Sequence, residues 1–204
     1  MKRRIAVLIS GSGTNLQSII DKAEAGTLPV DIACVISDRS DAYGLVRAQK
    51  HGIPSFHIDP KCFTSRNEHE DAIISILEEK RVELVVLAGY MRLLTPRMVG
   101  RYRNRIINIH PALLPSFPGT DGYGDAWRYG VKVSGCTVHF VDEGCDTGPI
   151  ILQEVNPILE SDTFESFKER GLSIEHRALP EAIRLFCEGR LTVEGRRVRI
   201  SGKE

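Results

Sequence analysis

Residues 5–23 read IAVLISGSGTNLQSIIDKA, and this stretch decides the fold. The five apolar residues 5–9 are a length typical of a buried strand, and residues 10–15 form a glycine-rich loop directly after them. The apolar positions that follow recur at helical spacing and keep one face: Leu16, Ile19, Ile20 and Ala23. A buried strand, a tight glycine loop and an amphipathic helix together predict the opening of a βαβ unit.

The same alternation continues along the chain. Apolar runs at 32–36, 84–88 and 106–109, with a shorter candidate at 55–58, alternate with helical patterns, and residues 65–68 (SRNE) predict a capping box. After residue 110 a Pro/Gly-rich loop leads to a short helix at about 123–129. A half-exposed strand (133–141), a polar loop, a strand (150–155), a long helix (163–188) and a hairpin (191–194 and 197–200, turning at Gly195) follow. We predict an α/β fold with a mostly parallel twisted sheet of about seven strands, helices on both faces, a Rossmann-like N-terminal half and a C-terminal β-hairpin.

The charge balance argues against nucleic acid as a partner. Lys plus Arg and Asp plus Glu number 27 each, whereas nucleic-acid binders usually carry a basic excess. We interpret the one basic cluster as a charged edge strand, with a weak phosphate-contacting patch as the alternative. The cluster consists of Arg190, Arg196, Arg197, Arg199 and Lys203.

The cysteines and apolar runs indicate the compartment. Five scattered cysteines without a C-x-x-C motif predict neither a disulfide framework nor a thiolate zinc site, and they favour a reducing compartment. Cys136 and His139 form a C-x-x-H pair, but a strand would place them on opposite faces, so we predict no metal. The N-terminal apolar run is too short for a signal peptide and no run approaches a membrane span, so we predict a cytoplasmic protein without a membrane partner.

The loop at residues 10–15 (SGSGTN) predicts an anion site. Its glycines expose backbone N–H groups, the helix N-terminus adds partial positive charge, and Thr14 and Asn15 add side-chain donors. Leu16 stands where a dinucleotide fingerprint needs glycine, and the Walker A lysine is missing. The loop alone leaves open a tight strand–helix turn that binds nothing.

Asn108, His110 and Asp146 are the candidate catalytic residues. Asn108 and His110 close a predicted strand and share one face, at the strand end where α/β sheets bind ligands, and Asp146 lies in a later polar loop. An amide, an imidazole and a carboxylate suit acyl transfer to an external amine, because the amine brings its own nucleophilicity. Asn108 and protonated His110 would stabilise the oxyanion, and Asp146 would orient His110 and assist proton transfer. The alternative is a satisfied histidine and a capping aspartate in ordinary loops.

Four segments in order resemble a known family: residues 10–15 (SGSGTN), 87–94 (LAGYMRLL), 108–115 (NIHPALLP) and 146–150 (DTGPI). Over about residues 4–190 the chain resembles the phosphoribosylglycinamide formyltransferases, folate-dependent enzymes of purine synthesis. The resemblance implies the formyltransferase fold and transfer of a formyl group from the co-substrate 10-formyltetrahydrofolate to the amine of glycinamide ribonucleotide. It implies small-molecule partners and either a monomer or a homodimer. We expect one domain (1–204), with the ribonucleotide phosphate on about 1–100 and catalysis and folate binding on about 101–204.

The resemblance also implies residue roles. Asn108, His110 and Asp146 match the catalytic triad. The ribonucleotide would be held by Gly13, Thr14 and Asn15 at its phosphate and by Glu175 at its ribose hydroxyls. The folate would be held by Arg66 at the glutamate tail, by Met91, Arg92, Leu93 and Leu94 at the pterin, and by Asn108, Asp142 and Asp146, with the loop 142–146 wrapping the pterin through backbone groups. The alternatives are a solvated Glu175, a solvated Arg66 and plain loop packing at 91–94. The Leu114–Pro115 bond is expected to be cis.

The chain departs from the family pattern at one segment. Residues 120–124 (TDGYG) stand where some members carry histidines, so we assign that segment no role and expect Tyr123 and Trp127 to pack. Three rivals remain. A methionyl-tRNA formyltransferase would need a further C-terminal domain, and a formyltetrahydrofolate hydrolase would need a further N-terminal one. A non-catalytic module would bind a nucleotide without formyl transfer.

Overall fold

The computed structural model describes residues 2–202, so Lys203 of the basic cluster lies outside the described residues. The predicted α/β class, mostly parallel sheet and C-terminal hairpin are confirmed, but the sheet has nine strands in the described part of the chain rather than about seven. The smaller number was wrong because it left out the terminal hairpin, which joins the sheet where Arg197 pairs with Ile150. The chain divides into two compact units, Met1–Ile107 and Asn108–Glu204, which are described in turn.

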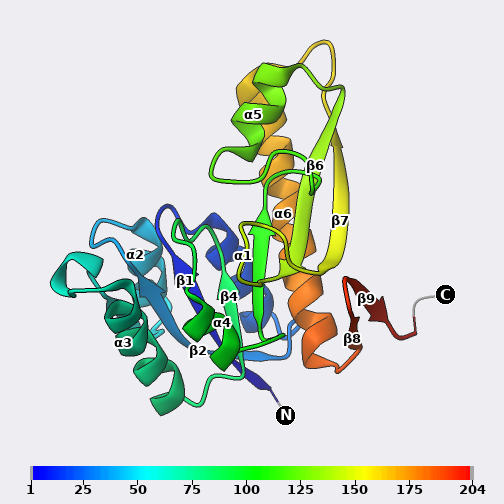
Figure 1. Ribbon diagram of the computed structural model, residues 1–204. Coiled ribbons are helices and arrows are strands. Elements are labelled where there is room, and N and C mark those ends of the chain that lie inside the picture. The colour runs from blue at the N-terminus through cyan, green and yellow to red at the C-terminus, as the bar shows by residue number, and fades with distance from the viewer. Residues whose placement is uncertain (1, 203–204) are drawn as a thin grey trace. The chain divides into compact units, whose positions relative to one another are not determined.

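The first unit alternates strands and helices, and its parallel strands follow the order β3-β2-β1-β4 (Figure 1). Its elements are β1 (Arg3–Ile9), α1 (Thr14–Glu24), β2 (Val30–Ser37), α2 (Tyr43–Lys50), β3 (Ser55–His57), the 3-10 helix η1 (Pro60–Cys62), α3 (Arg66–Glu79), β4 (Leu84–Leu87) and α4 (Pro96–Arg101). The apolar face expected of α1 is confirmed, since Leu16 and Ile19 are fully buried, and α3 likewise buries Ile73 and Leu77. The short helices α2 and α4 escape sequence reading because eight and six residues show little periodicity.

The predicted capping box at the start of α3 is only half correct. The Ser65 hydroxyl accepts a hydrogen bond from the backbone N–H of Glu68, as expected. The Glu68 carboxylate, however, accepts from the backbone and hydroxyl of Thr64 rather than from Ser65. Because Thr64 offers two donors to one carboxylate oxygen, Glu68 satisfies the turn one residue earlier than the motif predicts.

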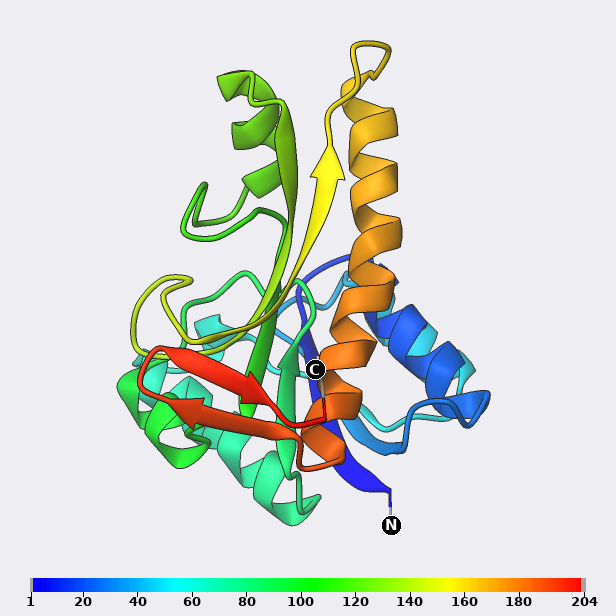
Figure 2. The same ribbon diagram turned by 90° about the vertical axis from the view of Figure 1, so that its right-hand side faces the viewer.

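The second unit is a sheet region covered by one long helix. Its elements are the end of β5 (Ile106–His110), α5 (Gly122–Tyr129), β6 (Val133–Phe140), β7 (Ile150–Pro157), α6 (Phe164–Cys187), β8 (Leu191–Glu194) and β9 (Arg197–Ile200). β6 and β7 pair antiparallel, β9 and β8 follow, and α6 runs beside β6 and β7 (Figure 2).

The expectation of a half-exposed strand at 133–141 was wrong. Every residue of β6 after Val133 is buried. α6 packs against β6, and the loop after β5 hydrogen-bonds to it, since the Thr137 hydroxyl donates to Ala112 O and accepts from Leu114 N. The alternation in the sequence therefore marked two faces of β6 that are buried against different neighbours, rather than one buried face and one face exposed to solvent.

None of the described helices has the length and apolar character needed to cross a membrane.

Candidate active site

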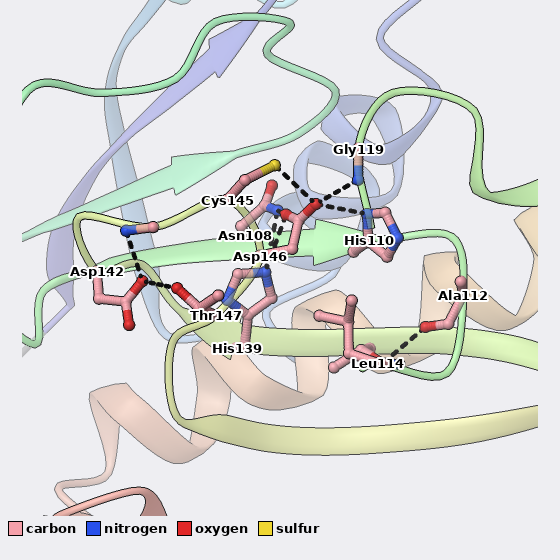
Figure 3. Close-up of polar contacts among 12 residues, drawn as sticks. Asn108, His110, Ala112, Leu114, Gly119, His139, Asp142, Cys145, Asp146 and Thr147 are labelled. Carbon is pink, nitrogen blue, oxygen red and sulfur yellow. Dashed lines mark hydrogen bonds and ion pairs between the residues drawn. The ribbon is translucent and has the colours of Figure 1, made fainter. Parts of the chain in front are cut away.

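The structure brings Asn108, His110 and Asp146 together in the second unit (Figure 3). Asn108 and His110 stand two positions apart on β5, and Asp146 reaches them from the loop between β6 and β7. Asp146 Oδ1 lies 3.4 Å from Asn108 Nδ2, and Asp146 Oδ2 lies 3.4 Å from His110 Nδ1. The cluster is well shielded, because His110 is only 2% exposed.

His139 on β6 completes the cluster, and sequence reasoning missed it. Its Nδ1 lies 2.8 Å from Phe140 O, and a carbonyl only accepts, so Nδ1 carries the proton. In the neutral ring Nε2 is then an acceptor, and the Asn108 amide donates to it across 3.1 Å. His139 thereby sets the amide orientation of Asn108. The Cys-x-x-His pair drew attention to His139 on this strand, but nothing in the sequence indicated that His139 would contact Asn108.

His110 has one nitrogen fixed and one available. Nε2 lies 2.7 Å from Phe117 O and must donate to it, so a second proton can only sit on Nδ1, facing Asp146. Burial lowers the pKa of His110 below its ordinary 6.5, and the attraction of Asp146 opposes this shift only in part. At neutral pH the resting imidazole is therefore neutral and can accept a proton at Nδ1.

Asp146 is ionised under all ordinary conditions. Burial opposes its ionisation, but the nearby His139 and His110 and the hydrogen bond from the Gly119 N–H lower its pKa to about 2. The Gly119 N–H donates to Oδ2 across 2.8 Å. Asp146 also holds a left-handed backbone conformation, with φ of 54°, which aspartate tolerates better than most residues.

Cys145 is the thiol beside this cluster, with its Sγ 3.6 Å from Asp146 Oδ2. Burial, the Asp146 charge and the hydrogen bond to Asp146 raise its pKa, so the sulfur stays a thiol near neutral pH. A thiol is a poor nucleophile compared with a thiolate.

Side-chain hydrogen bonds hold the two loops around the cluster. Gln153 on β7 donates to Leu114 O across 2.9 Å, which together with Thr137 anchors the loop after β5, and the Leu114–Pro115 bond is cis as expected. In the later loop the Asp142 carboxylate accepts from Gly144 N at 3.1 Å and from the Thr147 hydroxyl at 2.6 Å. The Asp142 side chain thus holds its own loop, which leaves backbone groups for any ligand.

In the first unit, the loop after β1 has the geometry of an anion cradle. Gly13 has φ of 70°, and an added Cβ would lie 2.7 Å from Gly44 Cα, so only glycine fits. The N-cap residue of α1, Gly13, makes no side-chain hydrogen bond to the first turn, which begins at Thr14. Asn15 is buried in the first turn.

Arg47 adds a positive charge to this loop that sequence reasoning missed. Its Nε donates to Ser12 O across 2.9 Å, and its Nη1 donates to Gln17 Oε1 across 3.0 Å. Arg47 lies on α2, far from the loop in sequence, and a single arginine on a short helix gives no signal of this contact.

The segment after β4, which the family resemblance assigns to folate, is tied to the same loop. The Met91 N–H donates to the Ser10 hydroxyl across 2.9 Å, and that hydroxyl donates to Asp38 across 2.6 Å. Met91 and Leu93 are both 57% exposed, so their side chains are available to a ligand.

Two residues of α3 support the same segment from one helix face. Arg66 donates to Leu93 O, which makes it a support of the backbone rather than the simply solvated residue of the alternative interpretation. The buried Glu70 accepts from Thr95 N at 2.9 Å. Leu94 is buried between these contacts, and Arg92 is half-buried.

Glu175 lies on α6 in the second unit and is 4% exposed, so the alternative of a solvated helix carboxylate was wrong.

Tyr123 packs edge-on against Phe167, and Trp127 stacks on the same ring, which confirms the expected packing roles. Within residues 2–202, no three or more His, Cys, Asp or Glu side chains are arranged so that they could hold a metal ion.

Comparisons with known proteins agree on one family. The formyl transferase family model matches residues 3–183. Phosphoribosylglycinamide formyltransferase of Haemophilus influenzae is 45% identical, covering 98% of this chain and 95% of its own. The trifunctional purine biosynthetic protein adenosine-3 of Gallus gallus is 44% identical over 94% of this chain, which spans 19% of that longer protein. The crystal structure of glycinamide ribonucleotide transformylase 1 from Symbiobacterium toebii matches with a TM-score of 0.95 and 56% identity, covering 98% of this chain and 94% of that one. The chain belongs to the phosphoribosylglycinamide formyltransferases, within the formyl transferase family.

Proposed function

We propose that the chain transfers the formyl group of 10-formyltetrahydrofolate to the amine of glycinamide ribonucleotide in purine biosynthesis, by direct attack of that amine. The family supports the two substrates and the pathway. The observation that carries the mechanism is the shielded cluster of Asn108, His110, His139 and Asp146, which offers donors and a proton acceptor.

The state of the nearest thiol supports direct attack. A covalent route would need an activated nucleophile, and the raised pKa of Cys145 keeps its sulfur protonated. The substrate amine is a nucleophile without such help once it is neutral. Formyl transfer therefore needs a group that takes up the proton released from nitrogen.

His110 is that group. Its neutral resting state leaves Nδ1 able to accept the amine proton, and Asp146 Oδ2, 3.4 Å away, stabilises the imidazolium that results. The proton can then pass to the departing folate nitrogen, which balances the transfer. His110 thus acts first as a base and becomes the charged donor expected from the sequence only as the reaction proceeds.

Asn108 would stabilise the oxyanion that forms on the formyl carbon. One amide hydrogen is held by His139 at 3.1 Å, while the contact with Asp146 is 3.4 Å, at the long end of hydrogen-bond range. The amide hydrogen on the Asp146 side is held weakly, so it is the one that can donate to the oxyanion. Losing such a donor costs roughly 100- to 1,000-fold in rate.

The remaining predicted residues would bind the substrates. Gly13, Thr14 and Asn15 would hold the phosphate at the α1 N-terminus, with Arg47 as an additional charge near the loop, and Glu175 would meet the ribose. On the folate side we assign Arg66, Met91, Arg92, Leu93 and Leu94, together with Asn108, Asp142 and Asp146.

One assay tests the reaction class. The protein is mixed with 10-formyltetrahydrofolate with and without glycinamide ribonucleotide, and loss of the formyl donor and formation of the formylated ribonucleotide are followed. We expect turnover only with the ribonucleotide. Turnover without it would favour a hydrolase, and no turnover would favour a binding module.

A second experiment tests direct attack. Intact-protein mass spectrometry after incubation with the formyl donor alone should show no formylated protein. Cys145→Ser should keep turnover close to that of Cys62→Ser, a matched change at another exposed thiol. A formylated Cys145, or loss of turnover only in Cys145→Ser, would contradict direct attack.

We infer a cytoplasmic protein that is a monomer or a homodimer. The five cysteines are scattered along the sequence and lack a C-x-x-C motif, which supports a reducing compartment. Light scattering coupled to gel filtration would distinguish the two assemblies, and a larger mass would contradict both.

A further inference from the structure

Tyr123 lies in the segment that departs from the family pattern, and its hydroxyl meets Glu175. The hydroxyl donates to Glu175 Oε1 across 2.5 Å, and both residues are more than nine-tenths buried. The two are 52 positions apart in the sequence, on α5 and α6. A hydrogen bond from a neutral hydroxyl to a carboxylate at this distance is among the stronger kinds in proteins.

The surroundings of Tyr123 are shaped to hold it at that carboxylate. Its ring meets Phe167 edge-on, with centroids 5.6 Å apart. Gly171 lies opposite the hydroxyl, and an added Cβ there would be 2.4 Å from the Tyr123 oxygen. Glycine is less favourable than alanine inside a helix, so its presence at this position is explained by the space that the Tyr123 phenol needs.

We propose that Tyr123 is a positioning residue that holds the Glu175 carboxylate in place for the sugar hydroxyls of the ribonucleotide, and so sets the preference for ribose. The inference rests on the proposed function, which assigns Glu175 to the ribose. It goes further by giving a role to a residue for which the family pattern offers none.

The chemistry of the pair explains the proposed role. A carboxylate accepts hydrogen bonds at both oxygens, so a phenol hydroxyl and sugar hydroxyls can share one carboxylate. Burial and the neighbouring Glu175 raise the pKa of Tyr123, so its hydroxyl stays a donor at any working pH. A carboxylate held in one orientation loses less freedom when the sugar binds than a mobile one would.

The test removes only the hydroxyl, by Tyr123→Phe, and measures steady-state kinetics with glycinamide ribonucleotide and with its 2′-deoxyribose analogue. We expect the KM for the ribonucleotide to rise roughly tenfold, kcat to stay within about twofold, and the KM for folate to stay unchanged. The preference for ribose over deoxyribose should shrink to that of Glu175→Gln. Adding Tyr123→Phe to Glu175→Gln should change KM by less than about twofold, because the two residues act as one unit.

Two controls separate positioning from packing. Tyr129→Phe removes a phenol hydroxyl from the same helix at a residue that is 78% exposed, and it should leave all constants unchanged. Trp127 is the single tryptophan and stacks on the Phe167 ring that Tyr123 also touches, so its fluorescence should stay native in Tyr123→Phe.

The outcomes distinguish this inference from the proposed function. An unchanged KM for the ribonucleotide in Tyr123→Phe would overturn the positioning role alone. So would a Tyr123→Phe change that raises this KM by the same factor in Glu175→Gln as in the wild type. If Tyr123→Phe fails to fold, Gly171→Ala replaces it, because the added Cβ would lie 2.4 Å from the Tyr123 oxygen and displace the hydroxyl. A raised KM for the ribonucleotide in that variant supports the inference, and an unchanged KM overturns it. A wild-type protein that does not turn over the ribonucleotide would overturn the proposed function and this inference together.

Discussion

Replacing Asp146 by asparagine is the most direct test of the catalytic cluster. The change removes the charge but keeps an amide oxygen that can accept from the Gly119 N–H, now 2.8 Å from Oδ2. The loop and the fold should therefore survive. What the variant loses is the attraction between a carboxylate and the imidazolium that forms at His110.

The distance sets the size of the effect. Opposite charges 3.4 Å apart attract by about 1 kcal/mol at the dielectric constant of water and by about 5 kcal/mol at an effective value of 20. The Asp146 side chain is 12% exposed, so we take an intermediate loss of about 3 kcal/mol, which corresponds to a roughly 100-fold lower kcat. The KM for the ribonucleotide should stay within about threefold, because the charge acts in the transition state.

The assay is steady-state formyl transfer as a function of pH. Since Asp146 raises the pKa of His110 against the effect of burial, the variant should have a still lower His110 pKa, and the acid limb of kcat should move to lower pH. Asp125→Asn, an exposed carboxylate paired with Arg128 at 2.6 Å, is the matched control and should leave kcat unchanged. A kcat within tenfold of wild type in Asp146→Asn, or an unmoved acid limb, would refute the reasoning.

Three further predictions concern the stability of the fold and the first unit. Because the pKa of Asp146 is about 2 rather than 3.8, its ionised form stabilises the fold by about 2 kcal/mol. This contribution is complete above about pH 4 and is lost as the pH falls towards 2. Between pH 4 and pH 2 the free energy of unfolding in urea should therefore fall by about 2 kcal/mol less in Asp146→Asn than in the wild type. Ser10→Ala removes the acceptor of the Met91 N–H and should raise the KM for folate about tenfold in steady-state kinetics. Gly171→Ala places a Cβ 2.4 Å from the Tyr123 hydroxyl and should lower the free energy of unfolding in urea by about 1–3 kcal/mol.

Each of these has a matched control. Equal loss of stability at low pH in wild type and Asp146→Asn would contradict the depressed pKa. Ser75→Ala removes an exposed hydroxyl from α3, and a folate KM in Ser10→Ala no higher than in Ser75→Ala would show that Ser10 does not hold the segment. Gly100→Ala on α4 meets no atom within 4 Å and should not destabilise, so equal stability of both glycine variants would contradict the steric argument.

Local patterns in the sequence determined much of this protein. Apolar periodicity located the strands and most helices, because burial of one face follows directly from residue spacing. Period-2 alternation placed Asn108 and His110 on one face of β5, and Ser65 marked the start of α3 through its own hydroxyl. Each of these inferences depends on neighbours within a few positions of the chain.

Only the tertiary structure decided the contacts that join distant segments. His139 meets Asn108 across 31 positions and Tyr123 meets Glu175 across 52, and neither pair leaves a local pattern. The resting charge of His110 was equally hidden, because burial and the distance to Asp146 together set its pKa. Strand pairing and helix packing bring such groups together and remove water from them, so their partners and their protonation belong to the folded chain.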